Sequence, residues 1–130
     1  MSSKLEDFLE LGNVDDIQEE ITVKVNGKDL TLKVRAMSEA EHSDFQRRAQ
    51  NFKGKTFSFD TGKYNSLVIP ACVVEPNFNS ADFLAKAKCQ TAWDFLSRKF
   101  PAGVLTDIAQ KIQELSGFET FDMEIENAKN

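Results

Sequence analysis

The segment 21–35, ITVKVNGKDLTLKVR, alternates apolar and polar residues on both sides of an Asn-Gly pair. Such alternation predicts two half-buried strands, and Asn26-Gly27 suits the positive φ angles of a type I′ turn. A two-residue turn fixes the register, with Val25 opposite Lys28, and every pair beyond it matches apolar with apolar, hydroxyl with hydroxyl, or plus with minus. The sequence therefore predicts a β-hairpin that needs another element on its apolar face, because an isolated hairpin is only marginally stable in water.

The longest apolar run, Leu67–Val74, has no charged, amide or hydroxyl side chain and must be enclosed on nearly all sides. Apolar residues recur at helical spacing after Asp60, which can cap a helix N-terminus. The β-branched residues of the run favour a strand, but Pro70 cannot donate a hydrogen bond into a central ladder. We expect a central helix that is kinked or loosened at Pro70, ends at Glu75 and covers the hairpin.

A second helix is predicted to start at a capping box, because Ser38 and Glu41 stand three residues apart. Phe45 and Phe52 recur on one face of this helix, so we expect it to run to about residue 51 or 52. The Lys-Gly-Lys sequence that follows would end it. Residues 56–59 alternate hydroxyl and aromatic side chains, which predicts either a short third strand or an extended lead into the central helix.

Helical spacing also dominates the part of the chain that follows the central helix. Its apolar stripe places Trp93 in the core but leaves open whether residues 81–99 form one helix or two. Pro101 suits the first position of the last helix, because its missing amide hydrogen would be unpaired there, and Gly117 suits the left-handed position that ends it. The sequence thus predicts a helical body over residues 39–118 and, with the hairpin, a single α+β domain that is mostly helical.

Length and charge narrow the class of protein further. A chain of 130 residues fits one domain that buries roughly two-thirds of its unfolded surface. A net charge of −5 disfavours nonspecific binding to nucleic acid or to anionic membranes. No stretch reaches the roughly 18 apolar residues of a membrane span, and the acidic N-terminal region lacks the pattern of a signal peptide. We therefore expect a protein of the cytoplasm.

No residue pattern predicts a catalytic, cofactor or metal site. His42 lies in a predicted helix without a predictable catalytic partner, so we expect an exposed histidine. Gly54-Lys55-Thr56 resembles the end of a phosphate loop, but Ala49 stands where that loop needs its first glycine. Cys72 and Cys89 occupy apolar-patterned positions without metal-ligand spacing and are expected to be buried free thiols. The chain is therefore expected to be a binding module and not an enzyme.

A candidate partner contact lies at the start of the chain. Leu5, Phe8 and Leu9 form an apolar stripe on a predicted short helix within residues 1–12. A helix of two or three turns is not stable in water alone, so this one must dock on something. We expect it to cover the core of its own domain, and docking on a partner is the alternative.

A second candidate contact lies in the acidic tail, residues 119–130. Phe121, Met123 and Ile125 alternate there with acidic residues. Such a segment can be disordered, add a strand beside the hairpin, or expose a small apolar site to a partner. We expect at least its last few residues to be disordered.

The stretch FDTGKYNSLVIPACVVEPNF, residues 59–78, carries a family resemblance. It resembles the FDT-x-KY and VVEPN motifs of the XkdN-like tail assembly chaperones, small proteins of contractile-tailed phages and related prophage elements. The match continues, in the family's order, in LEDFLELG (5–12), VRAMSEAE (34–41) and PAG…IAQKIQELSGF (101–118). The resemblance thus covers most of the chain, and its motifs are structural rather than catalytic.

This resemblance implies a phage tail assembly chaperone that binds the tape measure protein noncovalently, keeps it soluble and helps recruit tail tube subunits. It also implies self-association, action in the cytoplasm of the bacterial host and absence from the mature virion. A structural protein of the tail or of the head-to-tail connection is the alternative. Related phages make a longer form by ribosomal frameshifting, and Ala128-Lys129-Asn130 is compatible with an adenine-rich slippery sequence that the nucleotide sequence would reveal.

Overall fold

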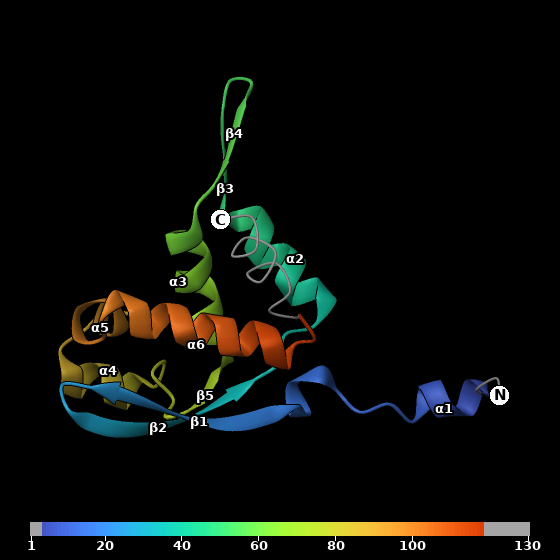
Figure 1. Cartoon of the computed structure of the whole chain (residues 1–130), viewed down its shortest axis with the longest axis horizontal. Helices are drawn as coiled ribbons and strands as arrows, with labels where there is room; N and C mark the ends of the chain where they lie inside the picture. Colours follow the sequence, from blue (N-terminus) through green and yellow to red (C-terminus); the bar gives the residue numbers. More distant parts are fainter. Residues whose placement is uncertain (1–3, 119–130) are drawn as a thin grey trace, which may run out of the picture.

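A computed structural model of the chain describes residues 4–118, which form an α+β domain with a three-stranded and a separate two-stranded sheet (Figure 1). The elements, in chain order, are α1 (Leu5–Leu9), the 3₁₀ helix η1 (Val14–Asp16), β1 (Gln18–Val25), β2 (Lys28–Arg35), α2 (Glu39–Arg48), β3 (Gln50–Lys53), β4 (Thr56–Phe59), α3 (Thr61–Cys72), β5 (Val73–Glu75), α4 (Ala81–Ala87), α5 (Ala92–Lys99) and α6 (Ala102–Leu115). The predicted fold class is confirmed.

The β1–β2 hairpin has the register that its turn predicts. Val25 pairs with Lys28 and Ile21 with Leu32, and both turn residues have positive φ, 54° at Asn26 and 77° at Gly27. β5 pairs antiparallel with the other side of β2, which gives the strand order β1-β2-β5. The hairpin is therefore one edge of a three-stranded sheet, and β1 is its outer strand.

The central helix α3 begins as predicted, because the Asp60 carboxylate accepts a hydrogen bond from the Lys63 amide at 3.0 Å. It contains Pro70 but ends at Cys72, so the prediction that it reaches Glu75 is wrong. Residues 73–75 instead form β5, which pairs with β2. Their β-branched valines favour extended backbone, and the open side of β2 supplies hydrogen-bond partners that a local pattern does not reveal.

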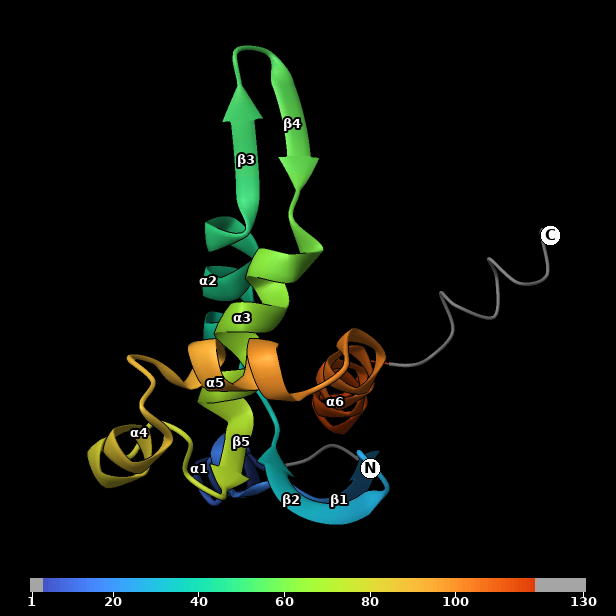
Figure 2. The same ribbon diagram turned by 90° about the vertical axis from the view of Figure 1, so that its left-hand side faces the viewer.

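Helix α2 starts at the predicted capping box, in which the Ser38 hydroxyl accepts from the Glu41 amide at 3.2 Å. It ends at Arg48, so the prediction that it runs to residue 51 or 52 is wrong. Residues 50–53 form β3, and residues 56–59 form β4, the short strand that was one of the two alternatives. Figure 2 shows that this second hairpin projects from the end of the molecule opposite the three-stranded sheet.

Residues 81–99 form two helices. Lys88 adopts a left-handed conformation with φ of 58° after α4, and the Thr91 hydroxyl caps α5 by accepting from the Asp94 amide. Pro101 is the N-cap residue of α6, one position before the first helical position that was predicted for it. Gly117, with φ of 97°, follows the C-cap residue of α6 as predicted. The described chain from residue 61 onward therefore supplies four helices, α3 to α6.

The core lies between the sheet and the helices. α6 packs against β1 and β2 and against α3, while α3 joins the sheet through β5 (Figure 1). The most completely buried large side chains include Val34 of β2, Val68 and Ile69 of α3, Leu96 of α5 and Ile112 of α6. Helix α6 thus packs directly on the β1–β2 hairpin, and the central helix α3 packs on α6.

Candidate partner-binding surfaces

Helix α1 carries the predicted stripe, and nothing in the described part of the chain covers it. The exposed fractions of Leu5, Phe8 and Leu9 are 72%, 60% and 77%, and the helix buries no residue. Its N-terminus is closed by the Asp7 carboxylate, which accepts from the Lys4 amide at 3.0 Å. Figure 1 shows α1 set apart from the body of the molecule. The expectation that this helix covers its own core is therefore wrong, because the connecting segment carries it away from the sheet.

The exposed apolar surface continues past α1. Leu11 is 73% exposed, and Val14, the first residue of η1, and Ile17, which follows η1, are also exposed. Sequence reasoning missed these residues, although Leu11 lies three residues after Phe8 and so extends the same helical spacing. Residues 5–17 thus carry a run of exposed apolar side chains.

The β3–β4 hairpin offers a second exposed apolar surface. Phe52 and Phe57 are paired across the strands with ring centroids 5.3 Å apart, and Phe59 lies on the same face because it opposes Gln50, two residues before Phe52. Phe52 and Phe57 are 69% and 54% exposed, and Phe59 is 43% exposed. The sequence prediction missed this surface, since it placed Phe52 on the buried face of a helix. The alternation of Thr56 to Phe59 was the available signal.

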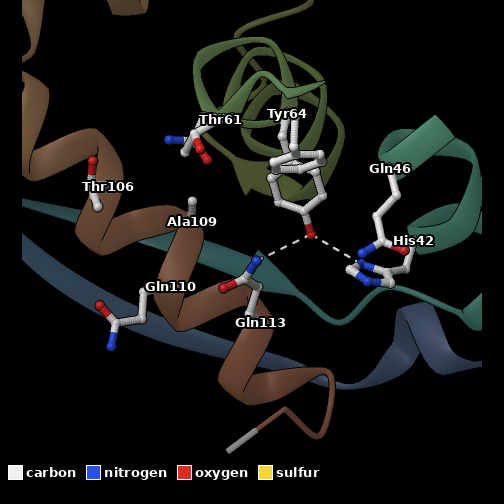
Figure 3. Close-up of a pocket in the computed structure, with 10 residues that line it drawn as sticks. His42, Gln46, Thr61, Tyr64, Thr106, Ala109, Gln110 and Gln113 are labelled. Atoms are coloured by element: carbon white, nitrogen blue, oxygen red, sulfur yellow. Dashed lines mark hydrogen bonds between the residues drawn. The ribbon is translucent and has the colours of Figure 1, made fainter. Parts of the chain in front are cut away.

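A small pocket lies at the base of this hairpin, between α2, α3 and α6 (Figure 3). Its volume is about 300 Å³. The Tyr64 hydroxyl lies 3.0 Å from His42 Nδ1 and accepts a hydrogen bond from Gln113 Nε2 at 3.2 Å. His42 is half-buried, so the prediction of an exposed histidine is wrong. Tyr64 lies 22 residues from His42 and 49 residues from Gln113 in sequence, so no local pattern reveals these contacts.

The electrostatics of this pocket favour neutral side chains. Burial lowers the pKa of His42 and raises the pKa of Tyr64. The other lining side chains are amides, threonines, Ala109 and Phe59, and none of them is a carboxylate. A phenol that resists ionisation is a weak nucleophile. The Tyr64 hydroxyl therefore links α3 to α2 and α6 through hydrogen bonds.

Comparison with known proteins identifies the family of this chain. The family model described as phage XkdN-like tail assembly chaperone protein matches residues 5–129. The chain belongs to this chaperone family. Membership indicates a non-enzymatic role and protein partners in phage tail assembly.

The chaperone also shares its fold with a solved structure. The crystal structure of the protein YqbN matches with a TM-score of 0.61 and 15% identity, and covers 92% of this chain and 100% of that one. Identity this low shows a common fold alone. Among curated proteins, none matches the chain in sequence.

An ion pair links the end of β2 to the N-terminus of α2 in the chaperone. The Arg35 guanidinium donates two hydrogen bonds to the Glu41 carboxylate, at 3.0 and 2.8 Å. These bonds are the largest cause of the lowered pKa of Glu41. Because the capping box uses the same carboxylate, Glu41 holds both the N-terminus of α2 and the end of β2.

The described residues of the chaperone form neither a disulfide nor a cluster of metal ligands. Cys72 is buried, and burial raises the pKa of its thiol to about 12, while Cys89 is only half-buried. Both thiols are free. Within residues 4–118, no group of three or more metal-binding side chains comes together, and no helix there is long and apolar enough to cross a membrane.

The second predicted contact set of the chaperone, Phe121, Met123 and Ile125, lies outside the described residues. The same holds for the expected disorder of the last few residues and for Ala128-Lys129-Asn130. These three expectations stay predictions.

Proposed function

We propose that this chaperone binds the phage tape measure protein noncovalently through the α1 stripe of Leu5, Phe8 and Leu9. The observation that carries this proposal is the exposure of all three side chains on a helix that the domain does not use for its own core. A five-residue helix is unstable alone, so a partner's apolar surface would stabilise it. An amphipathic segment of this kind fits against an apolar helix of a client.

Charge supports the same proposal. Glu6, Asp7 and Glu10 lie between or beside the apolar residues of α1, and the whole chain carries a net charge of −5. The apolar side chains would cover aggregation-prone segments of the client while the carboxylates keep the complex hydrated. Phe121, Met123 and Ile125 are proposed as a second contact set of the same apolar and acidic character.

We further propose that the chaperone recruits tail tube subunits to the covered client, self-associates along it and has no enzymatic activity. It acts in the cytoplasm of the bacterial host and leaves before the virion is complete. Family membership supports these steps, because it gives the chain protein partners in tail assembly.

Co-expression with the phage's tape measure protein tests the proposal. The tape measure protein should become soluble and co-purify with the chaperone. A Leu5→Ser/Phe8→Ser/Leu9→Ser variant should lose both effects while folding normally, because none of the three side chains is buried. The matched control, Glu6→Asp/Glu10→Asp, changes the same segment but keeps its carboxylates and should retain them. An insoluble tape measure protein in the presence of the unmodified chaperone would contradict the proposal.

A structural protein of the tail or of the head-to-tail connection is the rival assignment. Such a protein would be a stoichiometric part of purified phage particles, whereas a chaperone that leaves would be absent from them. Mass spectrometry of purified particles separates the two assignments.

A further inference from the structure

The β3–β4 hairpin exposes an aromatic face, which consists of Phe52, Phe57 and Phe59. Phe52 and Phe57 oppose each other across the two strands, and Phe59 lies on the same face two residues after Phe57. Figure 2 shows that the hairpin projects from the body of the molecule. Exposed apolar side chains that lie together in this way mark a surface for binding another protein.

The hairpin is also the basic part of an acidic protein. Residues 46–63 contain five lysines and arginines and a single acidic residue, Asp60. Lys53 directly follows Phe52, and Lys55 lies in the turn. Among the described residues, neither lysine forms an ion pair with an acidic side chain. A partner of the aromatic face is therefore expected to be acidic as well as apolar.

The N-terminal segment has this complementary chemistry. Residues 4–17 contain five acidic residues and a single lysine. Glu6, Asp7 and Glu10 lie between or beside the residues of the α1 stripe. Within residues 4–118, none of the three forms an ion pair with a basic side chain. The α1 stripe and the aromatic face are thus both exposed and apolar, and their surroundings carry opposite charge.

The apolar side chains of the two surfaces also repeat at similar distances. Leu5 and Leu9 are four residues apart on a helix, which separates them by about 6 Å along its axis. Phe57 and Phe59 are two residues apart on a strand, which separates them by about 7 Å. Successive side chains of the α1 stripe can therefore contact successive rings of the aromatic face.

The two surfaces lie far apart in one molecule. The segment between α1 and β1 is held at the three-stranded sheet, because the Ala36 amide donates to the Ile17 carbonyl at 2.9 Å. Figures 1 and 2 show α1 near this sheet and the β3–β4 hairpin at the opposite end. In this arrangement, a contact between the α1 stripe and an aromatic face joins two copies of the chain.

We propose that, in the chaperone without client, the α1 stripe of one copy docks on the aromatic face of a second copy. The inference rests on the proposed self-association and names its two surfaces. The contact is head-to-tail, so it joins copies into chains or rings. A five-residue helix and three rings make a small interface, and the association is therefore weak and depends on concentration. Because the client is proposed to bind the same α1 stripe, it would displace the neighbouring copy.

Sedimentation velocity of the full-length protein without client tests this inference. The sedimentation coefficient of the unmodified protein should rise with concentration. A Leu5→Ser/Phe8→Ser/Leu9→Ser variant and a Phe52→Ser/Phe57→Ser variant should each stay monomeric, because each lacks one of the two surfaces. An equimolar mixture of the two variants should form a heterodimer that grows no further, since only one contact between them is possible. Circular dichroism should show that both variants are folded, because the replaced side chains are exposed.

A charge exchange supplies a second test that keeps every apolar side chain. Lys53→Glu/Lys55→Glu should weaken self-association about tenfold or more, because it places carboxylates opposite the acidic residues of α1. Adding Glu6→Lys/Glu10→Lys to the same chain should restore most of the association.

Lys28→Glu/Lys99→Glu is the matched control for the charge exchange. It makes the same change in net charge at two exposed lysines outside the β3–β4 hairpin. Self-association of this variant should equal that of the unmodified protein.

The possible contrary results differ in what they contradict. An unmodified protein that stays monomeric at every concentration would overturn both the inference and the proposed self-association. If the unmodified protein associates, equal association of either serine variant, or a mixture of the two that stays monomeric, would overturn the inference alone. No client is present in these experiments, so such results would leave the proposed client binding untouched.

Discussion

Arg35 and Glu41 join the end of β2 to the first turn of α2 through two hydrogen bonds, and Tyr64 joins α3 to α2 and α6. The Ser116 hydroxyl adds a third such link by accepting from the Met37 amide at 2.8 Å. Buried and half-buried polar groups thus link the elements where they meet. Each link is testable by removing one polar group and keeping the side chain's shape.

We predict that Glu41→Gln lowers the free energy of unfolding by about 1 kcal/mol near neutral pH. The hydrogen bonds from Arg35 hold the pKa of Glu41 below its usual value, so folding favours the ionised carboxylate. This contribution is complete above the pKa of the unfolded state and is lost as pH falls through the lower folded pKa. Urea unfolding at about pH 7 and about pH 3 measures it, and the difference between variant and wild type should shrink at the lower pH.

Glu39→Gln is the matched control for this measurement, because Glu39 lies in the same first turn but does not contact Arg35. Its effect should be smaller at both pH values. A Glu41→Gln effect that stays the same at low pH would contradict the assigned role of the ionised carboxylate.

We predict that Tyr64→Phe lowers the free energy of unfolding by about 1–2 kcal/mol. The change keeps the ring but leaves His42 Nδ1 and Gln113 Nε2 without the hydroxyl that joins them. Chemical denaturation measures the loss. Gln46→Ala, an exposed change in the same pocket, should be neutral by comparison. A Tyr64→Phe protein as stable as wild type would show that the network does not hold the three helices.

At the scale of elements, prediction from sequence succeeded where local chemistry decides the outcome. Asn26-Gly27 permits a two-residue turn, and that turn fixes every pair of the β1–β2 hairpin. The second hairpin was missed because Phe45 and Phe52 continue a helical spacing across the end of α2. What ends the helix there is the pairing of β3 with β4 through Gly54, which has φ of 61°. Such pairing competes with helix extension and is not visible in periodicity.

The same limit applies to the candidate sites. An apolar stripe such as Leu5, Phe8 and Leu9 has the same pattern whether it covers its own domain or a partner, so the sequence predicted the stripe but not its exposure. His42 and Gln113 meet at Tyr64 only because α2, α3 and α6 pack together. The separation between these residues removes any local signal.

Helix α6 packs on both the sheet and α3, and we predict that Ile112→Ala lowers the free energy of unfolding by about 2–5 kcal/mol. Ile112 is completely buried on a helix that contacts both the sheet and α3. Phe52→Ala removes a larger side chain from the exposed hairpin and should change stability by less than about 0.5 kcal/mol. Thermal or urea unfolding of the two variants compares them. Similar losses would contradict the assignment of Phe52 to a surface outside the core.

At the scale of the whole molecule, the buried core and the exposed apolar surfaces are separate. The core lies between the three-stranded sheet and α3 to α6, whereas α1 and the β3–β4 hairpin extend from the body in different directions (Figures 1 and 2). Changes to either surface should therefore leave the domain folded. This separation suits a chaperone, because client contact does not compete with its own folding.

Amide hydrogen exchange of residues 5–11 in the purified complex with the tape measure protein tests the central claim most directly. The segment is exposed in the free chaperone. The proposed contact therefore predicts that its amides exchange at least about tenfold more slowly in the complex than in the free protein. The buried α6 amides should serve as an unchanged reference. A stable complex in which residues 5–11 exchange as fast as in the free protein would contradict the account.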